Sequence, residues 1–434
     1  MLLAFAMAAA AEPEAPVKAS LHGDVKLFFL AGGLTYSWFE LSDEALDELG
    51  MTAEEANEQL GLDETAFSQG VANVWLKGSA ELGKVRLDVH WAIAGQTAST
   101  FAGAVGIGTG VGLQAPELVP LTWNPDLGEG LSLQHRFDRL VLSAKLPHVD
   151  VALGRQPVSF GVGRFFTPMD LVNPFHPATI DTEYKPGVDA LRVDGYAGTA
   201  GKVTAVAAWA GNPVVGKDAE DFGWEDAVLA ASGQATVGVT DVLAFVGSVR
   251  AEPVFGLGTA SSVGPVGVHA EATVTFPEDE DPFVRAVAGA DWRPTGTTTL
   301  TGEAYIQSFG ATDPAEYLDA LRGERFERGE IWQMGQLYGA VAVAQEITPL
   351  VNANVAVIGN LRDPSALVTL GAGWSVSDNA TLSVGAYAGV GEPPDTLELN
   401  GLMLPPGDEE VKRSVNSEFG LYPAMGFVQM RAYF

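Results

Sequence analysis

The last nine residues of the chain, Gly426 to Phe434, carry the pattern that most constrains its fold. Every second residue from Val428 to Phe434 is apolar, whereas Gln429 and Arg431 stand between them. Successive side chains of a strand point to opposite faces, so one face of this strand is wholly apolar and the other is mixed. The pattern predicts a strand between two different environments: lipid and an aqueous lumen, or the core and surface of a soluble sandwich.

The composition favours the first of these environments. Hydrophobic residues make up 47% of the 434 residues, and yet the formal net charge is -31. Beyond the first eleven residues no apolar run approaches the roughly 20 residues that a spanning helix needs. Hydrophobicity is instead spread over short alternating segments, which is typical of a membrane barrel. The absence of Cys excludes disulfides, thiolate metal sites and a lipid-modified amino-terminal Cys.

Alternating segments recur along the whole chain and predict about 18 strands. The expected ranges are 21–30, 74–82, 85–91, 135–146, 149–158, 187–196, 202–210, 226–237, 241–250, 253–260, 265–276, 283–293, 298–308, 334–346, 350–359, 365–376, 380–390 and 426–434. The segment Val254 to Ala260 is the weakest, and it is included because an even number places both termini in the periplasm.

The connections alternate between short turns, such as Gly83-Lys84, and loops of about 10 to 40 residues, as in outer-membrane barrels. The first loop holds ten carboxylates, and no Lys or Arg occurs between Lys26 and Lys77. Within it, Thr52 and Glu55 have the spacing of a helix capping box, and Gly50 is a candidate C-cap. The predicted fold is all-β: a transmembrane antiparallel barrel with long acidic external loops and short periplasmic turns.

The most distinctive stretch lies between Arg139 and Tyr196. Residues 154–156 (GRQ) close one strand, residues 161–164 (GVGR) open a loop, and residues 184–187 (YKPG) begin the next strand. Together with the aromatic carboxyl terminus, this stretch resembles bacterial outer-membrane porin-like β-barrel proteins, and more loosely the alginate-export porin family. The resemblance implies the outer membrane of a Gram-negative bacterium, contact with its lipid and lipopolysaccharide, and recognition of Phe434 by the barrel assembly machinery. Alginate-type channels imply an electropositive lumen, and this sequence departs from that pattern.

The amino terminus predicts a targeting segment. Residues 1–11 form a short apolar run that ends in small residues and precedes Glu12-Pro13-Glu14, as in a signal peptide cleaved near Ala11. Because the positively charged start of such a signal is missing, we expect the signal to be truncated. The predicted organisation is a signal peptide at 1–11, a spacer at 12–19 and the barrel at 20–434. A frayed apolar terminus is the alternative.

Strand parity assigns charged side chains to the predicted lumen. The basic candidates are Lys26, Lys77, Arg86, Arg139, Lys145, Arg192, Arg285 and Arg431. The acidic candidates are Asp24, Glu81, Asp88, Asp194, Glu271, Asp291 and Glu303. The two sets nearly balance, so most of the net negative charge lies on loops. A balanced polar interior indicates a water-filled channel or a plugged lumen, and the same residues can pair as structural ladders.

The loop from Phe160 to Glu183 is the candidate constriction. It contains three prolines and four phenylalanines, whose apolar area favours packing against the barrel wall. We expect it to enter the lumen, with acidic residues facing arginines across a narrow aperture; an external cap on the rim is the alternative. The predicted pore-lining and constriction residues are Arg86, Asp88, Arg139, Arg155, Arg164, Asp170, Asp181, Lys185, Arg192 and Asp194.

These features predict a porin for passive diffusion of small hydrophilic solutes through a charge-lined lumen. The alternative is an outer-membrane binding or adhesive barrel with a plugged lumen. The acidic balance argues against nucleic acid as a partner, since phosphates need a basic footprint. The sequence lacks the Gly-x-Ser-x-Gly and His-Glu-x-x-His motifs, and we expect neither an enzyme nor a cofactor.

Overall fold

The computed structural model describes residues 17–37, 39–55, 65–98, 117–125, 131–172, 184–198, 200–209, 226–327, 329–399 and 408–434. The expected signal peptide lies outside these ranges. No helix in the described ranges has the length and apolar character needed to cross a membrane.

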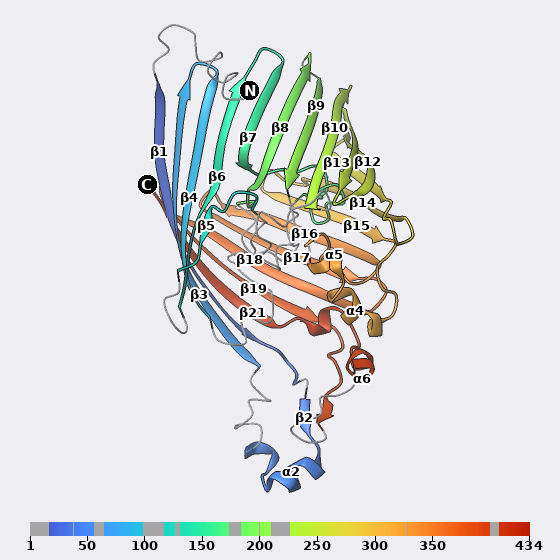
Figure 1. The fold of residues 1–434 in the computed structure, drawn as a ribbon. Coiled ribbons are helices and arrows are strands. Elements are labelled where there is room, and N and C mark those ends of the chain that lie inside the picture. Colours follow the sequence, from blue (N-terminus) through green and yellow to red (C-terminus); the bar gives the residue numbers. More distant parts are fainter. Residues whose placement is uncertain are drawn as a thin grey trace.

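The chain forms a closed antiparallel barrel of 18 strands (Figure 1). They are β1 (Lys18–Gly33), β3 (Ala66–Leu82), β4 (Val85–Ala98), β6 (Ser132–Lys145), β7 (Val149–Gln156), β8 (Val188–Ala197), β9 (Gly201–Trp209), β10 (Ala227–Val237), β11 (Thr240–Val249), β12 (Glu252–Val263), β13 (Val266–Thr275), β14 (Phe283–Trp292), β15 (Thr298–Gln307), β16 (Leu337–Thr348), β17 (Val351–Asn360), β18 (Ser365–Ser377), β19 (Ala380–Val390) and β21 (Ala424–Tyr433). Each predicted strand is observed, and the weakest prediction is confirmed as β12. The barrel expected from the sequence is therefore confirmed.

The closing strand β21 seals the barrel against β1. The register runs from Asp24 opposite Tyr433 to Gly33 opposite Ala424. The backbone groups of Gly23 and Phe434 exchange hydrogen bonds of 2.8 and 2.9 Å. Since β1 also pairs with β3, no strand of the wall is left with an open edge along its whole length.

The two faces of the wall differ as the alternating pattern predicts. On β1, Leu27 and Phe29 are 52% and 54% exposed, whereas Phe28 and Leu30 point inward and are 5% and 1% exposed. The register extends the outward apolar face around the barrel. Its exposed members include Leu87, Leu140, Leu153, Val203, Leu229, Val246, Phe255, Val284, Ile306, Val341, Leu370, Val384 and Val428.

The connections are short at one end of the barrel, called the turn end, and mostly long at the other, called the loop end. At the loop end the expectation of a long connection between every pair of strands is wrong. Residues 250–251, 276–282 and 361–364 are short links there. Arg250 and Ala251 have φ of 51° and 66°, the left-handed conformation that matches the twist of a two-residue hairpin.

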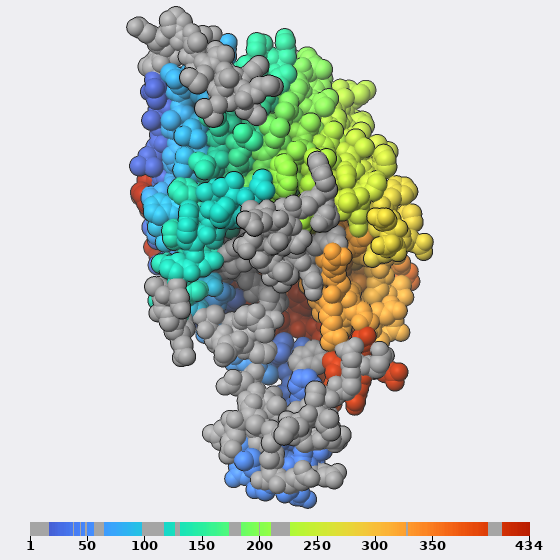
Figure 2. Space-filling view, viewed as in Figure 1, coloured from blue at the N-terminus to red at the C-terminus, as the bar shows by residue number. Residues whose placement is uncertain are grey.

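Smaller elements extend from the loop end. Strand β2 (Phe39–Leu41) pairs in parallel with β20 (Leu397–Leu399), and β5 (Thr122–Trp123) adds to the edge of β6. The helices are α2 (Asp43–Leu49), η3 (Pro314–Glu316), α4 (Tyr317–Leu321), α5 (Glu324–Glu327), α6 (Asp408–Arg413) and η4 (Phe419–Leu421). Figures 1 and 2 show the α2 region projecting beyond the barrel at the bottom of the view. Gly50 caps α2 in the left-handed conformation, and Glu55 accepts hydrogen bonds from Thr52, as predicted.

Candidate functional site: the inward segment of the barrel

The chain turns into the barrel after β7. Residues 157–172, called the inward segment, lie against the inner wall. The Phe160 ring meets inward-facing Phe245 edge-on at 5.3 Å, and Phe166 stacks on Tyr305 at 4.6 Å with an angle of 5°. Val158, Met169, Leu171 and Val172 are buried in one apolar cluster with wall residues of β8 to β12. These rings and aliphatic groups therefore pack on the wall rather than on an external rim.

Two wall carboxylates hold the backbone of the inward segment. Glu271 on β13 accepts hydrogen bonds from the N–H groups of Val162, Gly163 (3.1 Å) and Met169 (3.0 Å). Glu303 on β15 accepts from Arg164 (2.6 Å), Phe165 (2.9 Å) and Phe166 (3.0 Å). These hydrogen bonds offset the cost of burying the two carboxylates, and each is strengthened by the charge.

Glycines allow the close approach at this point. A Cβ on Gly163 would lie 1.9 Å from the carbonyl oxygen of Phe166. At Gly161, φ is +101° and a Cβ would lie 2.5 Å from Glu271 Oε2. Any larger residue would displace the backbone from the two carboxylates.

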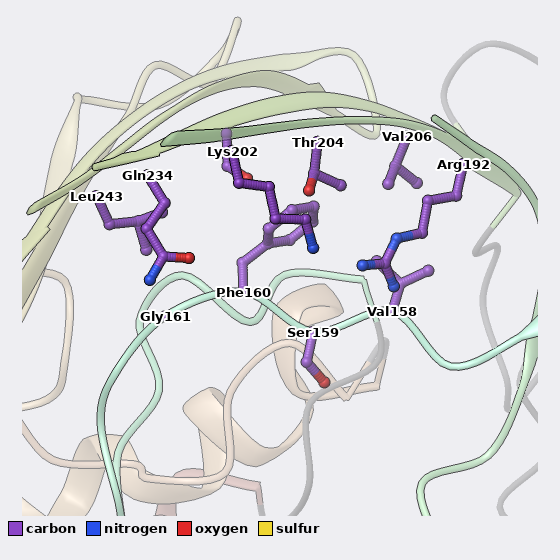
Figure 3. Close-up of a pocket in the computed structure, with 11 residues that line it drawn as sticks. Val158, Ser159, Phe160, Gly161, Arg192, Lys202, Thr204, Val206, Gln234 and Leu243 are labelled. Carbon is purple, nitrogen blue, oxygen red and sulfur yellow. The ribbon is translucent and has the colours of Figure 1, made fainter. Parts of the chain in front are cut away.

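A cavity of about 130 Å³ separates part of the inward segment from β8 to β11. Figure 3 shows Arg192 and Lys202 reaching from the sheet toward the segment that carries Phe160. Arg192 Nε and Lys202 Nζ lie 2.9 and 3.2 Å from the two oxygens of Asp194, and the Thr204 hydroxyl donates to Asp194 at 2.6 Å. Both cationic side chains remain about one-third exposed, at 31% and 34%.

Arg164 is the more exposed cation. Its side chain is 57% exposed, and its Nε lies 3.3 Å from Asp291 Oδ2 on β14. The other oxygen of Asp291 accepts from the Thr301 hydroxyl at 2.8 Å. Arg164 is thus anchored through its backbone to Glu303 while its guanidinium faces solvent beside the wall.

Asp170 and Lys185 form a buried pair at 2.6 Å within the connection between β7 and β8. Burial raises the pKa of Asp170 to about 6 and lowers the pKa of Lys185. The expected arrangement of carboxylates opposing arginines across an aperture is wrong for Asp170 and Asp194. Each carboxylate forms an ion pair with a Lys or Arg side chain beside it. The attraction between two charges falls with distance, so a direct contact stabilises a buried carboxylate more than a cation across an aperture would.

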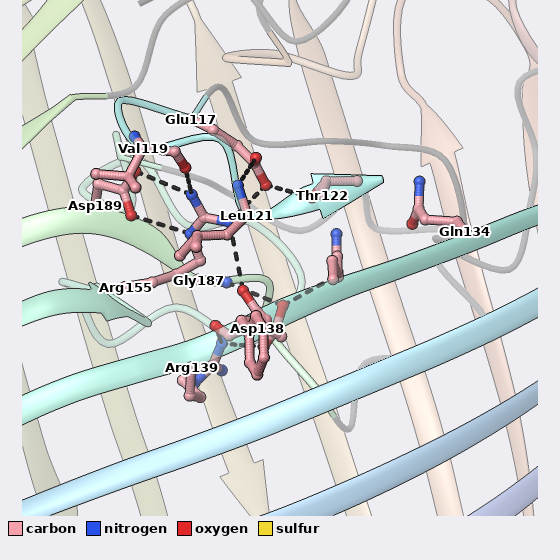
Figure 4. Close-up of polar contacts among 12 residues, drawn as sticks. Glu117, Val119, Leu121, Thr122, Gln134, Asp138, Arg139, Arg155, Gly187 and Asp189 are labelled. Atoms are coloured by element: carbon pink, nitrogen blue, oxygen red, sulfur yellow. Dashed lines mark hydrogen bonds and ion pairs between the residues drawn. The ribbon is translucent and has the colours of Figure 1, made fainter. Parts of the chain in front are cut away.

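Arg155 does not face the lumen. Its register partners are Leu140 and Asp189, and it shares a strand face with Leu153, which is 40% exposed on the outside. The guanidinium binds both oxygens of Asp189 at 3.0 Å, and it also binds Glu117 and the Val119 carbonyl (Figure 4). The assignment of Arg155 to the constriction is therefore wrong, since the period of two sets its face.

Arg139 faces inward because it alternates with outward Leu140, and a β-bulge follows directly on its other side. His90 pairs with Arg139 and Trp91 with Phe137, which leaves Asp138 as the extra residue of β6. Arg139 contacts Asp138 and donates to the Lys185 carbonyl. Arg86 and Asp88 form a half-exposed inward pair at 2.7 Å on β4. The predicted residue Asp181 lies outside the described residues.

Sequence parity placed Glu271 and Glu303 in the lumen but missed their role, because no local signal marks a carboxylate that binds a loop from another part of the chain. The three wall strands that follow β16 around the barrel differ in character. The inward positions of β17, β18 and β19, all within the described residues, carry no ionisable side chain except Tyr387. Their polar members include Asn352, Asn354, Thr369, Thr381 and Ser383. The lumen is therefore charged along one wall and neutral along another.

No protein-family model and no curated protein matches the sequence. Solved structures do match in fold. OpdK, an outer membrane protein from Pseudomonas aeruginosa, aligns with a TM-score of 0.53 and 9% identity over 96% of this chain and 98% of its own. Acinetobacter baumannii OccAB2 gives 0.54 and 7% over 96% and 98%, and Pseudomonas aeruginosa OccK5 (OpdH) gives 0.53 and 7% over 96% and 97%.

These structures support the porin-like barrel that the sequence resembles, and they give no support to the alginate-export family in particular. Over nearly its whole length, the chain has the fold of the outer membrane protein OpdK.

Proposed function

We propose that the protein is an outer-membrane channel of a Gram-negative bacterium for passive diffusion of small hydrophilic solutes. The observation that carries this proposal is the inward segment, which Glu271 and Glu303 hold against the inner wall of a closed barrel. A segment anchored in this way narrows the lumen without being part of the wall. The apolar exterior fits contact with membrane lipid, and the polar interior fits passage of water and solutes.

We propose a bore between the inward segment and the neutral wall of β17 to β19. Its charged side is lined by Arg164, Asp291, Arg192 and Lys202. Its neutral side is lined by Asn352 and Ser383. Since the charges of the inward segment are mostly paired, the field across the bore is weak. Uncharged hydroxylated solutes can then pass along the neutral wall, where amide and hydroxyl groups replace their hydration.

The cavity beside Phe160 adds a candidate resting point for a solute. OpdK has been crystallised with vanillate, an aromatic carboxylate. Here the cavity combines an aromatic ring with Arg192 and Lys202, whose two positive charges face the single carboxylate of Asp194. We propose that a small solute bearing a carboxylate can pause at this point.

Contact with lipopolysaccharide and recognition of the closing strand by the barrel assembly machinery belong to the same proposal. The exposed Phe434 at the end of β21 supports the second of these. We propose transport rather than catalysis as the activity.

The direct test is conductance of the purified, refolded protein in planar bilayers. Discrete conductance steps are expected, together with swelling of liposomes in small uncharged sugars and less swelling as sugar size increases. A folded barrel that gives no steps and no swelling would refute the channel. That result would favour the alternative, a binding or adhesive barrel with a plugged lumen.

A further inference from the structure

A cluster of two carboxylates and two tyrosines lies at the loop end of the barrel, and the channel proposal does not use it. Glu418 lies in the connection between β19 and β21, and Asp363 in the link between β17 and β18. Tyr317 belongs to α4, while Tyr338 and Asn360 come from the wall strands β16 and β17. The cluster therefore joins two long connections, 308–336 and 391–423, to the wall.

Neutral donors surround both carboxylates. Glu418 accepts hydrogen bonds from the Tyr338 hydroxyl (2.5 Å), Asn360 Nδ2 (2.7 Å) and the Met334 N–H (3.1 Å). Asp363 Oδ2 accepts from the Tyr317 hydroxyl (2.5 Å), Asn360 Nδ2 (3.2 Å) and the N–H of Glu418 (3.1 Å). Because Asn360 Nδ2 donates to both acids, the two carboxylates are near neighbours.

The pair lacks a counter-ion. The Glu418 and Asp363 side chains belong to residues only 1% and 5% exposed, and no Lys, Arg or His of the described residues forms an ion pair with either. Two cationic side chains of the same connections have other partners: Lys412 of α6 pairs with Asp319 of α4 at 2.8 Å, and Arg362 Nη2 donates to Gln336 at 2.6 Å. Buried Oδ1 of Asp363 accepts no hydrogen bond.

Two ionised carboxylates in one buried, cation-free site repel each other and lose their hydration. The arrangement is therefore stable with one proton on the pair. The second charge would have only neutral dipoles to stabilise it.

We propose that this cluster is a proton-dependent clamp: one proton on the Glu418–Asp363 pair holds residues 308–327, 329–336 and 408–423 on the loop end of the barrel, and its loss loosens them. The proposal does not depend on whether the barrel conducts.

The pH range follows from the buried acid. Burial raises the pKa of Glu418 to about 7, and the Asp363 carboxylate adds to the increase. A carboxyl with a raised pKa in the folded protein stabilises the fold fully below its ordinary pKa of 4.5. This contribution is lost as the pH rises through about 7. Burial and Asp363 raise the pKa of Tyr317, and burial and Glu418 raise that of Tyr422, so neither phenol supplies a compensating charge change near neutral pH.

The clamp also contacts the inward segment through its neighbours. Phe419 follows Glu418 directly and packs in the same apolar cluster as Phe166 and Tyr338. Phe166 and Tyr338 have ring centroids 6.1 Å apart. Loosening of the clamp can therefore change the packing of Phe166, in the part of the inward segment that Glu303 binds.

Hydrogen exchange measured by mass spectrometry tests the clamp in the folded, detergent-solubilised protein at pH 6 and pH 8.5, after correction for intrinsic exchange rates. Peptides from 313–336 and 408–423 should lose protection at the higher pH by about tenfold in all, because opening becomes about tenfold easier for each pH unit up to the pKa of about 7 and no easier above it. Peptides from β13 to β15 serve as the internal reference and should not change.

Asp363→Asn is the matched variant, because its amide oxygen can replace Oδ2 while its NH₂ takes the place of Oδ1, which accepts nothing. With one charge removed, this variant should keep its protection at pH 8.5. Glu418→Gln also removes one ionisable group from the pair and should behave in the same way. It provides a second variant if the first fails to fold. Glu278→Gln, in the link between β13 and β14, should retain the wild-type response. Equal protection of the wild-type protein at both pH values would overturn the proposal, as would an unchanged pH response in a folded Asp363→Asn or Glu418→Gln variant.

Discussion

Replacing Glu303 by Gln should partly detach the inward segment. Oε1 accepts from the Arg164 N–H and lies 2.7 Å from His269 Nε2, and Oε2 accepts from the N–H groups of Phe165 and Phe166. Gln turns one of these oxygens into an NH₂ donor that faces other donors, whichever way the amide is oriented. One or two charge-assisted hydrogen bonds are lost, and the remaining ones lose their charge.

Hydrogen bonds to charged groups contribute about 1.5–3 kcal/mol each, so the loss of two amounts to about 3–6 kcal/mol. At about 1.4 kcal/mol per factor of ten, the ratio of detached to attached segment rises by about 100-fold or more. The Phe166–Tyr305 stack and the buried Met169 remain. The expected result is therefore fluctuation between two conductance levels rather than permanent opening.

Single-channel recording at fixed voltage measures this change, with heat-modifiable migration on a gel as the check on folding. Asp88→Asn is the matched control, because it also removes one inward negative charge but its carboxylate binds Arg86 and not the inward segment. We expect it to change ion selectivity slightly without new conductance levels. If folded Glu303→Gln gives the same conductance and noise as the wild-type protein, the inward segment does not limit the bore.

One deletion and four substitutions test the closure of the wall and its faces. Deleting Phe434 should reduce the heat-modifiable barrel in outer-membrane fractions, because its backbone bonds to Gly23 are lost; an undiminished band would count against this. Leu370→Arg on the outer face should cost about 2–4 kcal/mol in urea unfolding from lipid vesicles, and Ser383→Arg on the inner face should cost little. Equal costs would show that the faces are wrongly assigned. Arg164→Ala should shift the reversal potential in a salt gradient toward cation selectivity, and an unchanged potential would remove Arg164 from the bore. Arg155→Ala should leave that potential unchanged but destabilise the barrel by about 3–5 kcal/mol, since the buried Asp189 and the partly buried Glu117 lose their cation; altered selectivity would contradict its outward position.

The sequence alone determined the barrel. Lipid and lumen impose a period of two on every strand, and that period survives in segments as different as β1 and β21. It located all the strands, including β12, and it assigned Leu370 outward and Arg431 inward. The capping interaction of Thr52 with Glu55 was also predicted from the sequence, because the two residues are three positions apart and need no distant contact.

Connection lengths and turn positions followed from the sequence only in part. The strand expected at 241–250 begins at Thr240, so the turn before it lies at residues 238–239, where Gly238 supplies φ of 65°. The expected strands 241–250 and 253–260 left two residues between them, but the tight turn at Arg250-Ala251 was not recognised. Neither residue type favours positive φ, and only the pairing of β11 with β12 imposes it.

The tertiary structure decided where the inward segment goes and which charges meet. Glu271 and Glu303 bind backbone groups more than 100 positions away in the chain, and Glu418 meets Asn360 across 58 positions. A periodic pattern reports the face of a residue, but it carries no information on which distant loop will cover that face. Arg155 was assigned to the constriction because of the loop beside it, although the period of two along β7 places it on the outer face with Leu153. Alternation along a strand is set locally, because lipid lies on one face and water on the other. Contacts between connections depend on the closed barrel, which brings distant parts of the chain together.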